Sequence, residues 1–416
     1  MHQPQSERDV RIQKITRMKQ LGIVPFAQSY DKTHLIADIT KQYEHADLRD
    51  IETIIPHPEV QVSTAGRMML YRSHGKLAFA RLLDSTEQIQ LMFHRDNCAI
   101  VVRGQPQVTL PLEGMPEAEG RLDEEATTLS AYKFLEKLVD IGDFIGVKGE
   151  VFRTHKGELT IFVSEFSFLS KSLRGLPEKY HGLSDPEELY RKRYLDMTMN
   201  PETYKRFLFK SKFYQTLREF YTKEGFIEIQ TPILDNAASG AAARPFITHH
   251  NDFDVEVYLR IAFETSLKKA TVGRFEKVFE IGQDFRNEGS DPSHLQEFTQ
   301  VEHYAVYWNY EDNMRFMEKM YDYLFEKLHL QKKLKVKDRE GVEKEVDFTT
   351  PRERIDYTKG INEASGLDIT KYTEADAERL REDIKAKGIA FEGMDEMGTT
   401  TLIDYLFKKV LRPKIL

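Results

Sequence analysis

The sequence predicts an α+β protein, in which a small closed β-barrel is followed by an antiparallel sheet flanked by helices. Two observations support this class. Between about residues 60 and 170, short alternating strands are separated by glycines at the bends, which is typical of a small barrel. From about residue 186 onward, amphipathic helical stretches alternate with strands joined by turn residues. The 416-residue length suggests two or three domains.

The composition excludes several classes of protein. Forty per cent of the residues are apolar, enough for real cores, and no stretch reaches the roughly 18 apolar residues of a membrane span. The first residues do not resemble a signal peptide. The single cysteine, Cys98, excludes an internal disulfide framework and a cysteine-rich zinc site. A cytoplasmic protein without a membrane partner is therefore expected. The net charge of −8 argues against a generally basic nucleic-acid binder but permits a local basic face.

The first predicted domain is an N-terminal helical extension, residues 1–58. Ser6 can cap a helix that ends at Gly22, and apolar residues recur along it at i, i+3 spacing. Several arginines and lysines give this helix a cationic side. That side is either an ordinary solvated face or a contact with a nucleic-acid backbone, and both interpretations stay open.

The second predicted domain, residues 59–171, is the barrel. Its predicted strands are 60–62, 66–71, 77–80, 89–93, 144–147, 149–152 and 159–163. Close spacing with glycine corners favours the OB-fold, a five-stranded barrel that binds oligonucleotides. The polar stretch 97–128 is interpreted as a long loop. A cationic, base-stacking face is predicted from Arg67, Arg72, His74, Lys76, Phe79 and Gln90. An alternating Phe79 fits the core as well as it fits such a face.

The third predicted domain, residues 172–416, begins within a linker at 171–185. A helix is predicted over about 186–224, then a strand at 226–234 that Pro232 restricts to a sheet edge or an interface. The next strand, 258–264, ends on Glu264 and leads into a helix from Thr265. Farther on, the pattern predicts a helix at 311–330, a charged hairpin at 332–348, a helix at 373–387 and a last helix from Thr401.

Residues 285–304 carry an unusual concentration of reactive side chains. Alternating strands at 277–282 and 297–304 flank turn residues, which predicts an antiparallel hairpin. Period-2 alternation places Arg286 and Glu288 on one face, Glu302 and Tyr304 on one face, and His294 on the loop. A cation beside acids suits a ligand with phosphate, carboxylate and ammonium groups. In isolation, a surface hairpin with solvated ion pairs explains the same pattern.

Sequence motifs narrow the choice of enzyme class. The chain has no GxxxxGK[ST], GxGxxG or HExxH, which argues against a P-loop NTPase or a dinucleotide enzyme. The sequence is instead similar to the bacterial type of class II lysyl-tRNA synthetases, from its first helix through its last. The stretch 225–232, GFIEIQTP, resembles the first class II motif, and FRNEG at 285–289 with EFT at 297–299 and Glu302 resembles the second. Residues 243–251, 171–173 and 176–179 resemble stretches that are particular to the lysine enzyme. Residues 66–67, 75–79 and 157–160 resemble parts of its anticodon-binding barrel.

The resemblance implies a lysine–tRNA ligase with a class II sheet after the OB-fold. ATP would activate lysine to lysyl-adenylate, with Mg²⁺ neutralising phosphate charge, and the lysyl group would pass to the 3′ end of tRNA(Lys). Arg286 would be the catalytic residue. The residues implied for ATP are Arg286, Glu288, His294 and Phe298, and those implied for lysine are Gly240, Glu264, Arg286, Glu302 and Tyr304. The anticodon would contact Arg67, Lys76, Phe79 and Gln90, and Pro232 would lie at the interface of a homodimer.

The chain also departs from the family pattern. Ser239 stands where the family has glycine, Phe263 where it has proline, and Leu295 and Gln296 where it has Asn-Pro. The largest expected departure is at the C-terminal end. Members of the family continue past the position of Leu416 into carboxylates that bind magnesium and lysine, and into a third motif.

The resemblance therefore implies a catalytic domain that is truncated at Leu416, its last residue. No metal ligand is expected within this chain, because the family's ligands would lie beyond Leu416. The alternatives are a non-catalytic tRNA-binding paralogue or an inactive fragment. An aspartyl or asparaginyl relative fits less well, because Glu264 and Glu302 suit a cationic substrate.

Overall fold

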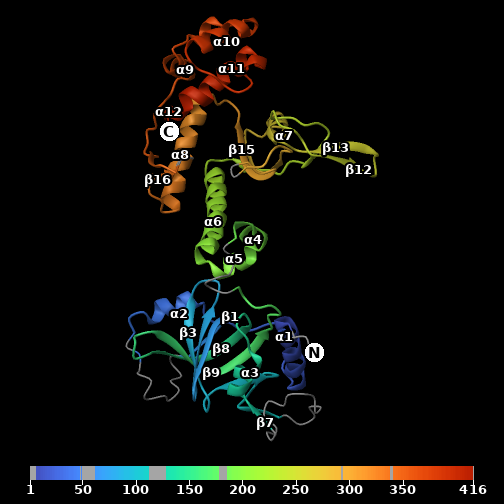
Figure 1. The fold of residues 1–416 in the computed structure, drawn as a ribbon, viewed down its shortest axis with the longest axis vertical. Helices are drawn as coiled ribbons and strands as arrows, with labels where there is room; N and C mark the ends of the chain where they lie inside the picture. Colours follow the sequence, from blue (N-terminus) through green and yellow to red (C-terminus); the bar gives the residue numbers. More distant parts are fainter. Residues whose placement is uncertain are drawn as a thin grey trace. The chain divides into compact units, whose positions relative to one another are not determined.

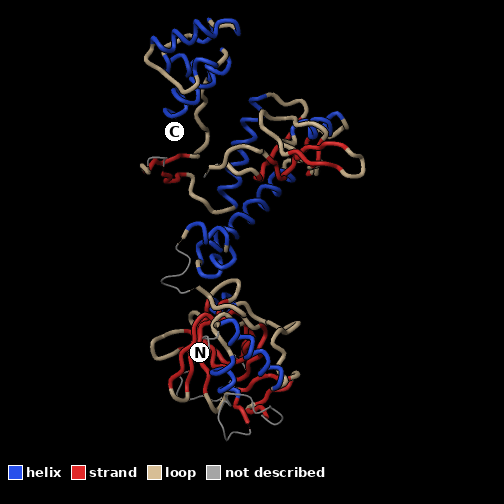
Figure 2. The backbone as a smooth tube through the Cα atoms, turned by 45° about the vertical axis from the view of Figure 1, so that its right-hand side comes forward, coloured by secondary structure: helices blue, strands red, loops and turns tan. Residues whose placement is uncertain are grey.

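In the computed structural model, the chain forms two compact units, residues 1–201 and 202–416. Figure 1 shows their elements in sequence order, and Figure 2 shows their helices and strands along the backbone. The structure describes residues 6–46, 48, 61–111, 128–177, 185–291, 294–337 and 341–415. Within these ranges, no helix is both long and apolar enough to cross a membrane.

Two of the predicted boundaries lie outside the described residues. One is the domain boundary between residues 58 and 59, and the other is Leu416, the expected point of truncation. The last described residue is Ile415, at the end of a short helix. The expectation that the family's metal ligands lie beyond Leu416 therefore stays a prediction from the resemblance.

A closed five-stranded barrel dominates the first unit and confirms the predicted OB-fold. Its strands are β1 (Gln61–His74), β2 (Leu77–Leu83), β3 (Gln88–His94), β8 (Phe144–Arg153) and β9 (Leu159–Ser170). They run in the order β3-β2-β1-β8-β9, and a parallel pairing of β3 with β9 closes the barrel. Both β1 and β8 are single strands where the sequence predicted two each. Gly149 makes this continuity possible in β8, because a Cβ there would lie 2.0 Å from the Phe162 carbonyl oxygen.

Alternation along β2 shows how the barrel divides inside from outside. Ala78, Ala80 and Leu82 are buried in the barrel core. Between them, Leu77 and Phe79 are half-buried and pack in a separate cluster with Met92, Phe152 and Phe162. Because successive strand side chains point to opposite faces, Phe79 lies on the outer face of the barrel. Its ring is therefore half-covered by outer-face neighbours and does not belong to the interior core.

Several elements of the first unit differ from the prediction. The stretch interpreted as a loop, 97–128, contains β4 (Ala99–Val102), β5 (Gln105–Gln107), β6 (Thr109–Pro111) and the start of β7 (Thr128–Ser130), while 112–127 falls outside the described residues. An unpredicted helix, α3 (Ala131–Leu138), begins where Ser130 Oγ accepts from the Lys133 N–H. The predicted first helix is present as α1 (Glu7–Gln20), capped by Ser6, and α2 (Ile36–Tyr43) was not predicted.

The long helix predicted over 186–224 is wrong as a single element. It is three helices: α4 (Pro186–Arg191), α5 (Arg193–Met199) and α6 (Pro201–Lys223). Proline explains the second break, because Pro201 lacks an N–H and disfavours helical backbone at the residue before it. Asn200 accordingly has an extended conformation, with φ −116° and ψ 100°.

A small sheet in the second unit separates a helical core from the predicted site. Its strands are β10 (Ile227–Glu228), β14 (Lys277–Phe285) and β15 (Glu297–Ala305); β14 and β15 are antiparallel, but β10 pairs with β14 in parallel. One face packs on α6 and α8 (Tyr310–Lys327), where Tyr221 stacks on Phe279 at 4.5 Å. The other face packs Val278 and Tyr304 against α7 (Glu264–Val272). This second face carries the alternating polar residues of both strands.

The remaining elements of the second unit are peripheral to this sheet. A three-stranded sheet contains β11 (Leu234–Asp235), β12 (Ile247–His250) and β13 (Val255–Leu259). The strand predicted to end on Glu264 stops earlier, and Glu264 instead begins α7. The charged hairpin is present as β16 (Lys333–Lys337) and β17 (Glu343–Asp347). The C-terminal helices share their own core and are α9 (Tyr357–Ser365), α10 (Ala377–Ala386), α11 (Thr399–Leu406) and α12 (Arg412–Ile415), with a π-helical turn at Phe407–Leu411.

Candidate functional site

The register of the β14–β15 hairpin brings the predicted groups onto one surface. Glu280 lies opposite Glu302, Gly282 opposite Gln300, and Asp284 opposite Phe298. The Arg286 N–H donates to the Gln296 carbonyl at 2.8 Å, so the pairing extends one step beyond the strands. Residues with even numbers therefore form one polar face across both strands. The surface-hairpin alternative does not describe this face, since Glu280 and Asp284 are buried.

Arg286 is held at the end of this face by two contacts. Its Nε donates to the Ile261 carbonyl oxygen at 3.3 Å, and its guanidinium carbon lies 5.0 Å from the centre of the Phe298 ring. The side chain is half-buried, so part of the guanidinium remains open to a ligand. A fixed guanidinium can pair with a phosphate or carboxylate group, and the aromatic ring beside it can stack on a planar base.

The opposite end of the face is acidic. Glu302 accepts from Gln300 Nε2 at 2.6 Å and from the Tyr304 hydroxyl at 3.4 Å. Burial, followed by the charge of Glu264, raises the pKa of Glu302. Burial together with both carboxylates raises the pKa of Tyr304. Glu264 pairs with Lys268 at 2.5 Å, and Gly240 lies against it, because a Cβ at Gly240 would be 3.0 Å from that of Glu264.

Position 240 requires a glycine. Its φ of +85° lies in the left-handed region that glycine adopts without strain, and a Cβ would crowd Ala262 at 3.2 Å as well as Glu264. The Ser239 hydroxyl is 2.8 Å from that of Thr265 at the start of α7. The turn at 239–240 therefore fits closely over the first turn of α7, against the Cβ of Glu264.

Glu288 and His294 lie on the loop that joins the two strands, and both are exposed. Glu288 Oε1 accepts from the Arg244 N–H at 3.3 Å, and the Asn287 N–H donates to the Arg244 carbonyl at 2.7 Å. His294 Nδ1 lies 2.6 Å from Asp291. The structure thus ties Glu288 to the 243–251 stretch and places His294 within its own turn.

The predicted anticodon residues lie at three places on the barrel. Phe79 and Gln90 share the outer face of β2 and β3, where Gln90 Nε2 donates to Thr160 Oγ1 at 3.0 Å. Lys76 lies in the β1–β2 turn with its Nζ 3.4 Å from Asp96. Arg67 is elsewhere: it donates to the Gly142 carbonyl at 3.0 Å and lies 4.3 Å from the Phe144 ring centre. Burial lowers the pKa of Arg67.

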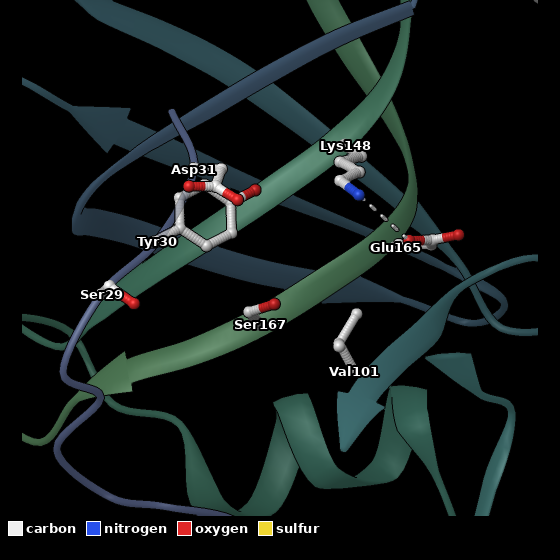
Figure 3. A pocket seen from close by; sticks show the side chains of 7 residues that line it. All are labelled: Ser29, Tyr30, Asp31, Val101, Lys148, Glu165 and Ser167. Carbon is white, nitrogen blue, oxygen red and sulfur yellow. Dashed lines mark ion pairs between the residues drawn. The ribbon is translucent and has the colours of Figure 1, made fainter. Parts of the chain in front are cut away.

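A separate hollow of about 230 Å³ lies on the barrel surface (Figure 3). It is lined by Ser29, Tyr30, Asp31, Val101, Lys148, Glu165 and Ser167. Tyr30 forms one wall of the hollow. Its ring lies directly over Gly146, where a Cβ would be 2.3 Å from the ring, so only glycine leaves room for it. The hollow includes none of the four residues predicted to contact the anticodon, so it is distinct from the outer face of β2 and β3.

Comparison with known proteins decides the family. Residues 185–407 match the tRNA synthetases of class II (D, K and N), and residues 62–169 match the OB-fold nucleic acid binding domain. The lysine–tRNA ligase of Fervidobacterium nodosum is 39% identical over 411 residues, which cover 98% of this chain and 72% of the relative. The chain belongs to the lysine–tRNA ligases of class II.

Two other relatives agree. The lysine–tRNA ligase of Thermosipho africanus is 38% identical over 98% of this chain and 73% of its own length, and that of Aquifex aeolicus is 41% identical over 84% of this chain and 52% of its own. The structure explains two departures of this ligase from the family pattern. Phe263 is buried, with the Arg260 guanidinium 4.7 Å from its ring centre. Gln296 Nε2 donates to the Glu288 carbonyl and to Ser290 Oγ, so it closes the hairpin loop.

Sequence reasoning missed four polar residues on the ligase hairpin face. Glu280, Asp284 and Gln300 are on the same face as Arg286 and Glu302, and Arg260 reaches that face from the end of β13. Period-2 alternation could have found Asp284, which precedes Arg286 by two residues. Arg260 could not be found this way, because it is distant in sequence from both acids that it contacts.

Proposed function

We propose that this protein activates lysine with ATP and transfers it to tRNA(Lys). A lysine carboxylate oxygen attacks the α-phosphorus of ATP, the bond to pyrophosphate breaks, and lysyl-adenylate forms. The tRNA 3′-terminal hydroxyl then attacks the lysyl carbonyl and releases AMP. The observation that carries this proposal is the single hairpin face on which a cation, an aromatic ring and buried acids lie in series.

Lysine selection is assigned to the acidic end of the face. Glu302 and Tyr304 would receive the side-chain ammonium, and Glu264, beside Gly240, would receive the α-ammonium. The half-buried position of Glu302 and its contact with Tyr304 support this assignment. A carboxylate that is partly desolvated rejects neutral or acidic side chains, because they would leave its charge without a partner.

Activation is assigned to the Arg286 end. Arg286 would pair with the lysine carboxylate and the α-phosphate, and would stabilise the negative charge that develops as the new bond forms. Phe298 would stack under adenine, and Glu288 and His294 would hold the adenine end and the outer phosphates. The 5.0 Å distance between the Arg286 guanidinium carbon and the Phe298 ring centre supports the proposal that both groups contact one nucleotide.

Magnesium enters this proposal with ATP. Among the described residues, no group of three or more histidine, cysteine, aspartate or glutamate side chains is arranged to hold a metal ion. We therefore derive no step through a metal bound by these residues and treat Mg²⁺ as part of the nucleotide substrate. The residues of this chain contribute position and charge.

The tRNA anticodon is assigned to the barrel. Phe79 and Gln90 on the outer face would stack and read single-stranded bases, and Lys76 would meet the backbone. Arg67 is also assigned to the anticodon, although one of its nitrogens already donates to the Gly142 carbonyl oxygen. Outer-face placement of Phe79 supports stacking, because a ring in the barrel interior would be unreachable.

We also propose a cytoplasmic homodimer with Pro232 at its interface. Pro232 is exposed and interrupts the chain between β10 and β11. Large apolar residues around it are exposed, as are three consecutive apolar residues of α6: Ile227, Ile233, Leu234, Phe207, Leu208 and Phe209, between 42% and 51% exposed. An apolar surface of this kind suits burial against a second copy.

An ATP–pyrophosphate exchange assay tests the proposal. The protein should exchange label in the presence of lysine and not in the presence of aspartate or asparagine. Tight binding of tRNA(Lys) without any lysine-dependent exchange would favour the non-catalytic alternative. Exchange with aspartate in place of lysine would contradict the roles of Glu264 and Glu302.

A further inference from the structure

A buried carboxylate lies in the middle of the hairpin face. Asp284 is fully buried, and within the described part of the chain neither of its oxygens accepts a hydrogen bond. Its one ion pair among the described residues joins Oδ1 to Arg260 Nε at 3.3 Å. Buried carboxylates are ordinarily paired and hydrogen-bonded, because an ionised oxygen without donors loses its hydration without compensation.

Arg260 is almost fully committed to other partners. Its Nη1 lies 2.6 Å from Glu280 Oε1 and also donates to the carbonyl and hydroxyl oxygens of Thr231, and its Nε donates to the Gln283 carbonyl at 2.9 Å. The guanidinium lies across Gly282, where a Cβ would be 2.4 Å from Nη2. Glu280 has therefore taken the strong interactions of this cation, and Asp284 receives a weak one.

A second acceptor without a donor lies beside Asp284. Gln300 is opposite Gly282 on the same face, and its Oε1 is buried with no hydrogen-bond partner among the described residues, while its Nε2 donates to Glu302. An ionised Asp284 would leave both of its own oxygens and this amide oxygen without donors. A proton on Asp284 would convert one of the three acceptors into a donor.

The charges around Asp284 come from each of the elements packed against it. Arg260 at the end of β13 and Arg286 after β14 favour its ionised form, while Glu302 on β15 and Glu280 on β14 oppose it. Burial has the largest effect, and together these influences raise the pKa of Asp284 to about 7. Glu302 in turn experiences the charge of Glu264 on α7.

We propose that Asp284 is a positioning residue of the lysine pocket, protonated in the empty site and ionised when a lysine ammonium neutralises Glu302. This inference rests on the proposed function. On lysine binding, the Oδ–H bond of Asp284 breaks and its proton passes to solvent. The new negative charge then holds Arg260 and Arg286 in place, so the substrate cation completes a charge balance that the empty pocket lacks.

The consequence is that lysine binding releases protons near neutral pH. For a group that titrates near pH 7 when free and well below pH 6 when lysine is bound, affinity falls by up to about tenfold from pH 8 to pH 6. Release should be detectable at pH 7, where Asp284 is partly protonated. A carboxylate that stays ionised throughout would release none.

Isothermal titration of the protein with lysine, in two pH 7 buffers of different ionisation enthalpy, counts these protons. Wild type should release a substantial fraction of one proton. The Asp284→Asn variant keeps the shape and a donor but cannot titrate. It should bind lysine at pH 8 at least about tenfold more weakly than wild type, release fewer protons, and lose most of the pH dependence between pH 6 and pH 8. The Asp252→Asn variant, in the exposed β12–β13 turn, should behave as wild type.

The outcomes distinguish a failure of the proposed function from a failure of this inference alone. If wild type does not bind lysine, the proposed function fails and this inference fails with it. If wild type binds lysine but releases no protons, or if Asp284→Asn releases as many as wild type, the inference alone is overturned. Lysine binding by Asp284→Asn at pH 8 that is as tight as that of wild type also overturns it, since an ionised Asp284 would then contribute nothing to the pocket.

Discussion

Each unit of the protein buries an ionic cluster, and the two are built differently. In the barrel, the fully buried Lys171 Nζ donates to the Leu138 carbonyl at 2.7 Å, to Asp140 at 2.5 Å and to Asp143 at 2.7 Å. The other oxygen of Asp143 accepts from the Ser172 N–H at 2.8 Å. Lys14 of α1 joins the same cluster through Asp140 at 2.5 Å. Every charged group here has strong partners from several segments.

The synthetase cluster has the same ingredients but is incomplete. Arg260 is saturated by Glu280 and Thr231, whereas among the described residues neither Asp284 oxygen has a hydrogen-bond donor. A fully satisfied network fixes the segments that it joins, and a partly satisfied one costs stability. We therefore infer that the barrel cluster stabilises the fold and that the synthetase cluster belongs to a ligand-binding site. This difference predicts that variants of the first alter stability and variants near the second alter chemistry.

The largest effect is expected for Lys171→Met. This change leaves Asp143 buried without its cation, which should cost the barrel about 3–5 kcal/mol of unfolding free energy. Trp308, the single tryptophan, packs in the core of the second unit, so its fluorescence follows that unit while far-UV circular dichroism follows both. Urea unfolding should show the barrel transition displaced and the Trp308 transition retained. Lys148→Met, at an exposed pair 4.0 Å from Glu165, is the control and should change little. Equal shifts for both variants would remove the distinction.

Arg286→Ala should show the reverse behaviour. Loss of the cation that meets the developing phosphate charge should reduce lysine-dependent ATP–pyrophosphate exchange by about 10²–10³-fold. The Trp308 unfolding transition should move little, because Arg286 is half-buried and its hydrogen bond to the Ile261 carbonyl is long, at 3.3 Å. Arg315→Ala on the exposed side of α8 should leave exchange unchanged. An Arg286 variant that unfolds but retains exchange per folded molecule would contradict the assignment.

A smaller effect is expected for Phe79→Ala on the barrel. Loss of one stacked base should weaken tRNA(Lys) binding by about 1–3 kcal/mol, measured by fluorescence anisotropy, with lysine-dependent exchange unaffected. Leu77→Ala is a matched control, because Leu77 is on the same strand and in the same outer cluster but has no ring. If both variants weaken tRNA binding equally, Phe79 contributes apolar packing and not stacking.

The comparison also shows why sequence reasoning succeeded in some places. Strands of the barrel were predictable because alternation is local: Ala78, Ala80 and Leu82 face inward in one continuous run. The hairpin that carries Arg286 and Glu302 was predictable for the same reason. Breaks in the 186–224 helix were missed because amphipathic spacing outweighed the signal of Pro201. Helix α3 had a readable start at Ser130, but it begins just after the stretch interpreted as a loop, and its eight residues were not predicted.

The candidate site was only partly predictable. Glu264, Arg286 and Glu302 were assigned through family resemblance, and the structure places them around one face. Asp284 and its incomplete pairing required three dimensions, because Arg260 reaches it across Gly282 from another strand. Sequence patterns describe periodicity along one element. They do not show which buried acid obtains the strong contacts of a shared cation.

The smallest expected effect is a difference in how the two units respond to pH. Burial alone would raise the pKa of Asp84 in the barrel, but Lys32, Thr86 and the Ile36 N–H hold it well below its ordinary range. A depressed folded pKa gives stability that is present above about pH 4 and is lost as pH falls further. Asp284 has the opposite sign, since its pKa of about 7 exceeds an unfolded value of about 3.9.

Stability from Asp284 is therefore full below about pH 4 and decreases as pH rises towards 7. Acidification from pH 7 to pH 5 should raise the free energy of unfolding of the Trp308 transition, by at most about 1.4 kcal/mol per pH unit. The barrel transition should move less, because in its cluster burial raises the pKa of Asp143 while the pKa of Asp140 is lowered. Asp284→Asn should reduce this slope to the part contributed by Glu302, whose pKa is also raised. Below pH 4 the barrel should weaken first. If acidification to pH 5 destabilises both units alike, Asp284 is ionised in the folded protein, and the synthetase cluster resembles the barrel cluster more closely than its geometry indicates.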